Sequence, residues 1–125
     1  MIRFRNNKAF RNMAIWRKSM ELVMITYELV QQLPRTEAFG LADQMRRAVV
    51  SIPSNIAEGF GRNTQGDFIH FLNIAQGSKY ELETQVEICV MLNYLRPEQA
   101  EPAFILCDEI GKMTNALIMS KKNNR

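Results

Sequence analysis

Residues 39–62 read FGLADQMRRAVVSIPSNIAEGFGR, and the spacing of apolar side chains in this stretch decides the fold. Apolar residues recur every three or four positions, the period of one helix face; they are Leu41, Met45, Ala48, Val49, Ile52 and Ile56. Polar residues follow the same spacing on a second face; they are Asp43, Arg47, Ser51, Asn55, Glu58 and Arg62. The stretch therefore predicts one amphipathic helix.

Pro53 lies in the middle of this predicted helix, where its ring clashes with the carbonyl of Val49 and removes one backbone hydrogen bond. The apolar face continues on both sides of the proline, so we expect a kinked helix. A break into two short helices is the alternative. The Gly59-Phe60-Gly61 sequence ends the helix, because glycine adopts the left-handed cap conformation at little cost.

Helical periodicity extends to both sides of this segment. Before it, residues 11–32 form a predicted helix that Pro34 ends, because the residue before a proline avoids α geometry. After it, the Thr64-Gln65-Gly66-Asp67 sequence predicts a capped start for a third helix that reaches about Tyr94. A fourth helix starts at Pro97 or Pro102, since proline is accepted in a first turn.

Four helices with short connections predict antiparallel neighbours. No strand pattern, linker or internal repeat is visible. The predicted fold is an all-α, antiparallel up-down-up-down four-helix bundle over residues 11–122, with a kinked second helix and a basic N-terminal tail at residues 1–10.

The chain has 125 residues, 46% of them hydrophobic, which fits one domain with its own core. Its two cysteines, Cys89 and Cys107, lie in apolar surroundings without a CxxC spacing. We expect buried free thiols, with a redox pair as the alternative. No stretch approaches the roughly 20 apolar residues of a membrane span, and no secretory signal is visible. We therefore expect a cytoplasmic location.

The net charge is only +3, but its distribution is uneven. Residues 1–18 hold six basic residues and no acid, and residues 112–125 hold four basic residues and no acid. An up-down-up-down bundle brings both chain ends and the second loop to one end of the molecule. The cations expected to gather there as phosphate contacts are Arg3, Arg5, Lys8, Arg11, Arg62, Lys121, Lys122 and Arg125.

The sequence offers no recognisable catalytic or metal-binding group. His70 is the only histidine, and no nucleophile with an orienting partner is spaced around it. The ExxH repeats of a di-iron bundle and the glycine-rich loop of a nucleotide site are both missing, so no metal and no cofactor is expected. Gly77 lies mid-helix, which costs about 1 kcal/mol, and close packing of two helices is the expected reason, with a ligand contact as the alternative.

Two motifs in this order are characteristic: RRAVVSIPSNIAEGFGR at residues 46–62 and GSKYELETQ at residues 77–85. With the Trp16 region and the connection from Pro34 to Gly40, they resemble the four-helix-bundle family of 23S ribosomal RNA intervening-sequence proteins over residues 14–95. The resemblance implies an up-down bundle that assembles as a ring-like homopentamer and has no established enzymatic activity. The architecture is also similar to the accessory variability protein of diversity-generating retroelements, a pentamer that binds nucleic acid.

The family motifs point to a polar set that serves either a subunit interface or a ligand, or is simply solvated; its members are Arg46, Arg47, Ser51, Asn55, Glu58, Gly77, Ser78, Glu81 and Glu83. The leading hypothesis is a non-enzymatic homo-oligomer that binds RNA or DNA through one basic rim without reading sequence, since no exposed aromatic platform is visible. A protein-interaction scaffold is the second hypothesis. A small-molecule enzyme using Arg47, Glu58, Glu81 and Glu83 is the third.

Overall fold

A computed structural model describes residues 9–123, which form four α-helices and two 3-10 helices. The helices are α1 (Ala14–Val30), α2 (Leu41–Phe60), α3 (Gln65–Met91) and α4 (Pro97–Asn123). The short helices η1 (Ala9–Asn12) and η2 (Arg35–Glu37) precede α1 and α2. No strand occurs in this part of the chain, and the all-α class is confirmed.

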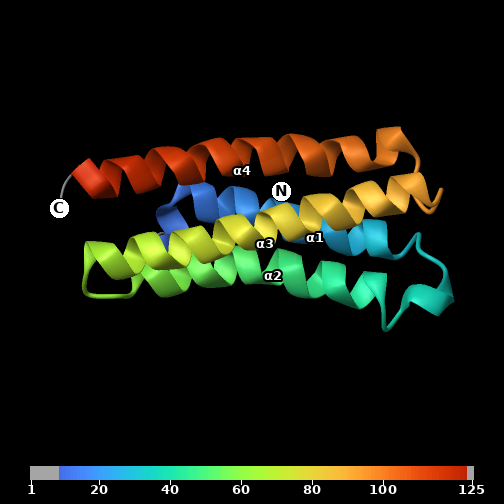
Figure 1. Ribbon diagram of the computed structural model, residues 1–125, viewed down its shortest axis with the longest axis horizontal. Helices are drawn as coiled ribbons and strands as arrows, with labels where there is room; N and C mark the ends of the chain where they lie inside the picture. Colours follow the sequence, from blue (N-terminus) through green and yellow to red (C-terminus); the bar gives the residue numbers. More distant parts are fainter. Residues whose placement is uncertain (1–8, 124–125) are drawn as a thin grey trace.

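The four helices lie side by side as an elongated bundle in which sequence neighbours run in opposite directions (Figure 1). Each helix packs against two others: α2 contacts α1 and α3, and α4 contacts α1 and α3. The start of α1, the turn between α2 and α3 and the end of α4 lie at one end. We call this the basic end. The other end, with η2 and the turn between α3 and α4, is called the far end.

Helix α2 continues through Pro53, whose side chain is buried. The alternative of two short helices is therefore wrong, while the kink at this proline stays a prediction. The Gly59-Phe60-Gly61 sequence ends the helix as expected, because Phe60 is its last residue. Gly61, however, has right-handed dihedral angles rather than the left-handed cap geometry.

The ends of α3 are set by two different local interactions. At its start, the Thr64 hydroxyl accepts a hydrogen bond from the backbone N–H of Asp67 at 3.0 Å, as the capping sequence predicts. At its end, Asn93 has a φ of 63°, and the N–H groups of Tyr94 and Leu95 both turn back to the carbonyl of Cys89. This left-handed residue ends α3 at Met91, three residues before the predicted boundary.

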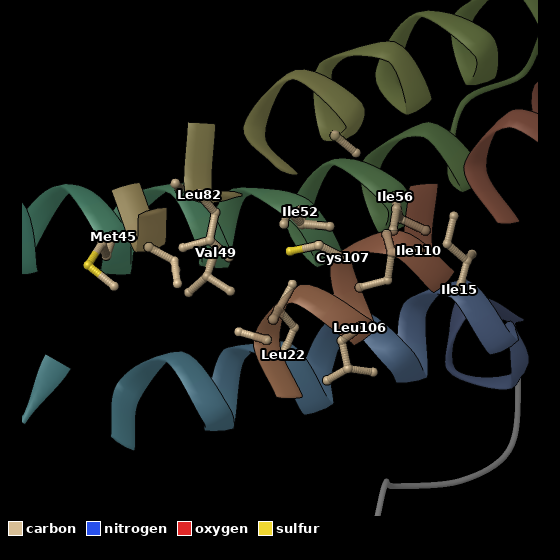
Figure 2. Packing of buried hydrophobic residues seen from close by; sticks show 14 of the residues in the cluster. Ile15, Leu22, Met45, Val49, Ile52, Ile56, Leu82, Leu106, Cys107 and Ile110 are labelled. Atoms are coloured by element: carbon tan, nitrogen blue, oxygen red, sulfur yellow. The ribbon is translucent and has the colours of Figure 1, made fainter. Parts of the chain in front are cut away.

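The core consists mainly of aliphatic side chains from all four helices (Figure 2). Leu22, Met45, Ile52, Leu82 and Ile110 are inaccessible to solvent or almost so. Full burial of one such side chain contributes about 1.5–3 kcal/mol, so this interior accounts for the association of the helices. At the basic end, Phe10 of η1 packs edge-on against Trp16 of α1, although the sequence places it in the tail.

Candidate nucleic-acid interface

The basic end collects cations from three separate segments of the described chain. Arg11 lies in η1, Arg62 in the turn between α2 and α3, and Lys121 and Lys122 in the last turn of α4 (Figure 1). These segments meet because adjacent helices run in opposite directions. Arg3, Arg5, Lys8 and Arg125, which the sequence also assigns to this surface, lie outside the described residues.

Three of these cations lie over aromatic rings. The Arg11 guanidinium is 4.6 Å from the centroid of the Phe10 ring, and that of Arg62 is 4.9 Å from the Phe71 ring. The Lys121 ammonium lies 5.5 Å from a third ring, that of Phe68. Such contacts hold a long cationic side chain near one position without cancelling its charge.

Phe60 adds an exposed aromatic ring to the basic end. It is 41% exposed at the last position of α2, and its ring meets that of Phe68 edge-on at 6.2 Å. The sequence suggests no aromatic platform, because periodicity alone does not show that a phenylalanine beside two glycines faces solvent. An exposed ring among cations is a surface on which a nucleic-acid base could stack.

The charges at the two ends are balanced differently. At the basic end, Arg62 pairs with Glu58 at 3.2 Å, whereas no ion pair occurs for Lys121 or Lys122 among the interactions of residues 9–123. At the far end, Arg96 pairs with Glu98 at 3.0 Å. Positive potential is therefore concentrated at one end of the bundle.

The far end is held together by a hydrogen bond between its two turns. The Tyr94 hydroxyl donates to the carboxylate of Glu37 at 3.0 Å, which raises the pKa of Tyr94 above its usual value because the bond requires the protonated phenol. Phe39, two residues beyond Glu37, is 98% exposed. This end thus combines compensated charge with an exposed aromatic side chain.

Only some members of the polar set of the two family motifs contact one another in the fold. Ser51 of α2 and Ser78 of α3 share a hydrogen bond at 2.8 Å between their hydroxyl oxygens. Asn55 donates to the hydroxyl and the carbonyl of Ser51 at 2.9 and 2.8 Å. These three side chains form a polar link between two helices, which explains their helical spacing in the sequence.

The charged members of the set point to different partners. Arg47 pairs with Asp43 at 3.0 Å on the surface, and Glu58 pairs with Arg62 at the basic end. Arg46 donates to the carbonyl of Ala38 at 3.3 Å. Glu83 pairs with Lys79 at 2.7 Å, so Glu58 and Glu83 are each engaged with another residue, whereas Arg47 and Glu81 line one groove.

A groove of about 280 Å³ does lie between α2 and α3; its lining residues are Gln44, Arg47, Ala48, Ser51, Ser78, Glu81 and Gln85. Gln85 is only 8% exposed, and its side-chain oxygen has no hydrogen-bond partner among the described atoms. The groove presents an arginine, a carboxylate and an amide oxygen on one surface. Such groups suit a polar partner surface.

Lys79 is buried between α3 and α4, and this burial was not predicted from the sequence. It is 5% exposed and pairs with Glu83 at 2.7 Å. A Cβ added to Gly111 would come within 2.9 Å of the Lys79 nitrogen, so the glycine on α4 provides the space for this lysine. The pairing at positions i and i+4 is the one sequence signal that could have suggested it.

Gly77 does not make room for another helix within the described chain. A Cβ built at Gly77 meets no atom within 4 Å, so the prediction that it allows close packing against a helix of the same chain is wrong. Gly59 has that role instead, because its Cβ would lie 2.8 Å from the Cβ of Phe71. The space around a glycine depends on the neighbouring helix, which its own segment does not specify.

Cys89 and Cys107 are free and buried, as predicted. Burial raises the pKa of the Cys89 thiol to about 11 and that of Cys107 to about 12. Because the thiolate is the nucleophile, both cysteines are poorly reactive near neutral pH. They contribute to packing, and Cys89 contacts the sulfur of Met45 at 3.6 Å.

His70 is exposed on α3, with its ring edge-on to that of Phe71 at 5.2 Å. Within residues 9–123, no three His, Cys, Asp or Glu side chains are grouped closely enough to hold a metal ion. None of the helices described is both long enough and apolar enough to cross a membrane.

Comparison with known proteins agrees with this architecture. A crystal structure of a protein of unknown function from the S23 ribosomal protein family of Bacteroides thetaiotaomicron superposes with a TM-score of 0.78. The two sequences are 29% identical, and the match covers 84% of this chain and 98% of the other. No curated protein sequence matches the chain. The family model described as 23S rRNA-intervening sequence protein matches residues 11–116, and the chain belongs to this family.

Proposed function

We propose that this protein is a non-enzymatic homo-oligomer that binds RNA or DNA through its basic end without reading base sequence. The observation that carries the proposal is the convergence of Arg11, Arg62, Lys121 and Lys122 from three chain segments onto one end of the bundle. Lysine and arginine bind phosphate by charge and release condensed counterions. The membership of the structural neighbour in a ribosomal protein family is consistent with RNA as the ligand.

Single-stranded RNA fits this surface best. The exposed ring of Phe60 lies on α2 directly before the turn that holds Arg62, and Phe68, which it contacts, also contacts Lys121. A stacked base beside cations that hold the flanking phosphates is the usual mode of sequence-tolerant single-strand binding. A duplex offers phosphates but no free base face, and is expected to bind less tightly.

The test measures binding of a mixed-sequence single-stranded RNA by fluorescence anisotropy as the salt concentration increases. We expect the logarithm of the affinity to fall linearly with the logarithm of the salt concentration. Replacing Lys121 and Lys122 by alanine removes two phosphate contacts, which should lower the slope by about 1.4 for a single strand.

The matched control is Arg35→Ala, which removes an exposed cation at the far end and should leave both affinity and slope unchanged. Phe60→Ala should weaken binding of single strands by roughly tenfold or more, corresponding to the loss of one stacked base. An affinity that does not change with salt, or equal effects of the far-end and basic-end variants, would contradict the proposal.

A protein-interaction scaffold is the second candidate, and one observation favours it. Phe39 at the far end is 98% exposed, and Met91 and Leu92 at the end of α3 are 74% and 51% exposed. Apolar side chains exposed to this degree are typical of a contact surface for another protein. The lysine variants separate the two functions, because they would leave a scaffold function intact.

A further inference from the structure

Helix α3 carries apolar side chains on two of its faces. Leu72, Leu82 and Val86 face the core, whereas Ile74 and Ile88 are exposed. On the same outer side lies Gly77, where glycine lowers helix stability by about 1 kcal/mol without making room for any atom of the described chain. Both features are explained if a second surface packs closely on the outer side of α3.

The outer residues of α3 follow the alternating three- and four-residue spacing of a helix-packing seam. We call this set the α3 stripe; it consists of Ile74, Gly77, Glu81, Thr84, Ile88 and Met91. All six are exposed. The stripe lies on the side of α3 that faces α2, because Gly77, Glu81, Thr84 and Ile88 line a groove of about 400 Å³ with Gln44.

Helix α4 carries a second stripe with the same spacing. The α4 stripe consists of Pro102, Ile105, Glu109, Lys112, Ala116 and Met119. All are exposed except Glu109, which is half-buried and paired with Lys18 of α1 at 2.7 Å. This stripe lies on the side of α4 that faces α1, because Ala116 lines an apolar groove of about 480 Å³ with Met13 and Ala14.

We propose that the α3 stripe of one molecule packs antiparallel against the α4 stripe of a second copy, and this inference rests on the oligomerisation proposed above. One register aligns all six positions of the two stripes, with Thr84 opposite Glu109, which is already paired with Lys18. It places Glu81 opposite Lys112, the small residue Gly77 opposite Ala116, Ile74 opposite Met119 and Ile88 opposite Ile105. Neither Glu81 nor Lys112 has an ion-pair partner within the described part of its own chain.

The partner that packs on the α3 stripe is a second copy of this protein, because the same chain carries both complementary stripes. The two stripes are complementary in charge at one layer, small against small at another and apolar against apolar at two more. Within one molecule they face apart, since α3 and α4 contact each other through other residues, such as Gln76, which bonds to Asn115 at 3.0 Å.

The proposed register also sets the orientation of neighbouring molecules. Inside one molecule Gln76 lies opposite Asn115, so the contact between copies is displaced by about two residues, or roughly 3 Å along the helix. Neighbours are therefore side by side at nearly the same height, with α3 antiparallel to the neighbour's α4. Each contact uses two different surfaces, which produces a ring or an open chain, and all basic ends point the same way.

A charge exchange tests the pairing. Light scattering gives the mass of the wild type, of Glu81→Lys, of Lys112→Glu and of the protein carrying both changes, and far-UV circular dichroism verifies the helical fold. Each single reversal places like charges in contact and should raise the dissociation constant about tenfold or more. The double variant restores an opposite pair in the reverse orientation and should recover the wild-type mass.

The control is Arg35→Glu at the far end, which changes the net charge as Lys112→Glu does but lies outside both stripes. A dissociation constant equal to that of the wild type in either single variant would overturn this interface, and the proposed oligomer would then have to form through another surface. Dissociation of both single variants without recovery in the double variant would overturn the register. A monomeric wild type would instead contradict oligomerisation itself, together with this inference.

Discussion

Three glycines on the helices of this protein have very different surroundings. Gly59 lies against the side chains of Phe68 and Phe71, and Gly111 leaves room for the buried Lys79. Gly77 faces open space in the described chain. Gly77 and Gly111 lie inside their helices, where glycine lowers helix stability, so the compensation at these two places must come from different contacts. For Gly77 we assign it to the neighbouring molecule.

Alanine substitution should therefore act in opposite directions at Gly59 and Gly77. Gly59→Ala should lower the free energy of unfolding by about 1–3 kcal/mol, because the new methyl group overlaps the Phe71 side chain. Gly77→Ala should raise it by about 0.5–1 kcal/mol when measured in the Glu81→Lys background, where assembly does not contribute. Urea unfolding followed by circular dichroism provides both values.

The same Gly77→Ala change should weaken assembly of the otherwise wild-type protein, since the added methyl group separates two closely packed helices. Stronger assembly together with higher stability would show that nothing approaches Gly77. Lower stability in the monomeric background would show that its surroundings are not open.

At the scale of the element, α3 contributes to the bundle packing, to the basic end and to the proposed subunit interface. It contacts both α2 and α4, contributes Phe68 and Phe71 to the basic end and carries the outer stripe. Its first turn is capped by Thr64, which follows Arg62 by two residues in the adjacent turn. The start of this helix is therefore important for stability and for the proposed RNA surface.

Thr64→Ala should lower the free energy of unfolding by about 1 kcal/mol, because the N–H of Asp67 loses its acceptor. Thr64→Ser retains the hydroxyl and should remain within a few tenths of a kcal/mol of the wild type. The comparison uses urea unfolding at constant pH. Equal losses in the two variants would mean that the side-chain oxygen does not cap the helix.

At the scale of the whole molecule, the two proposals are connected. Side-by-side packing through the stripes places every basic end on one side of the assembly, so a long RNA can contact several copies at once. Linked contacts of this kind raise the overall affinity well beyond that of a single contact. A short RNA that spans one basic end gains nothing from assembly.

Glu81→Lys should therefore bind a long single-stranded RNA more weakly than the wild type, although the substitution adds positive charge. Its affinity for a short RNA should be equal or slightly higher. The Glu81→Lys, Lys112→Glu double variant is the control and should recover the affinity for the long RNA. Anisotropy titrations with the two RNA lengths measure both effects. Tighter binding of the long RNA by Glu81→Lys would show that assembly does not contribute to the affinity for RNA.

Much of this architecture follows from local sequence. The helical class and most helix boundaries depend on interactions within a few residues, such as the apolar period of residues 41–56 and the Thr64 cap. Helical spacing likewise places Ser51 and Asn55 on one face of α2, whereas their hydrogen-bonded link to Ser78 of α3 was not predicted.

Other features were decided by tertiary structure. The burial of Lys79 depends on Gly111, which lies on a different helix, and the exposure of Phe60 depends on how α2 meets α3. Gly77 lies in the middle of α3 and Gly59 at the end of α2, yet it is Gly59 that contacts a neighbouring helix. Periodicity specifies which residues share a helix face, whereas the packing of other helices determines whether that face is covered. For this reason only the tertiary structure shows that the outer side of α3 is exposed.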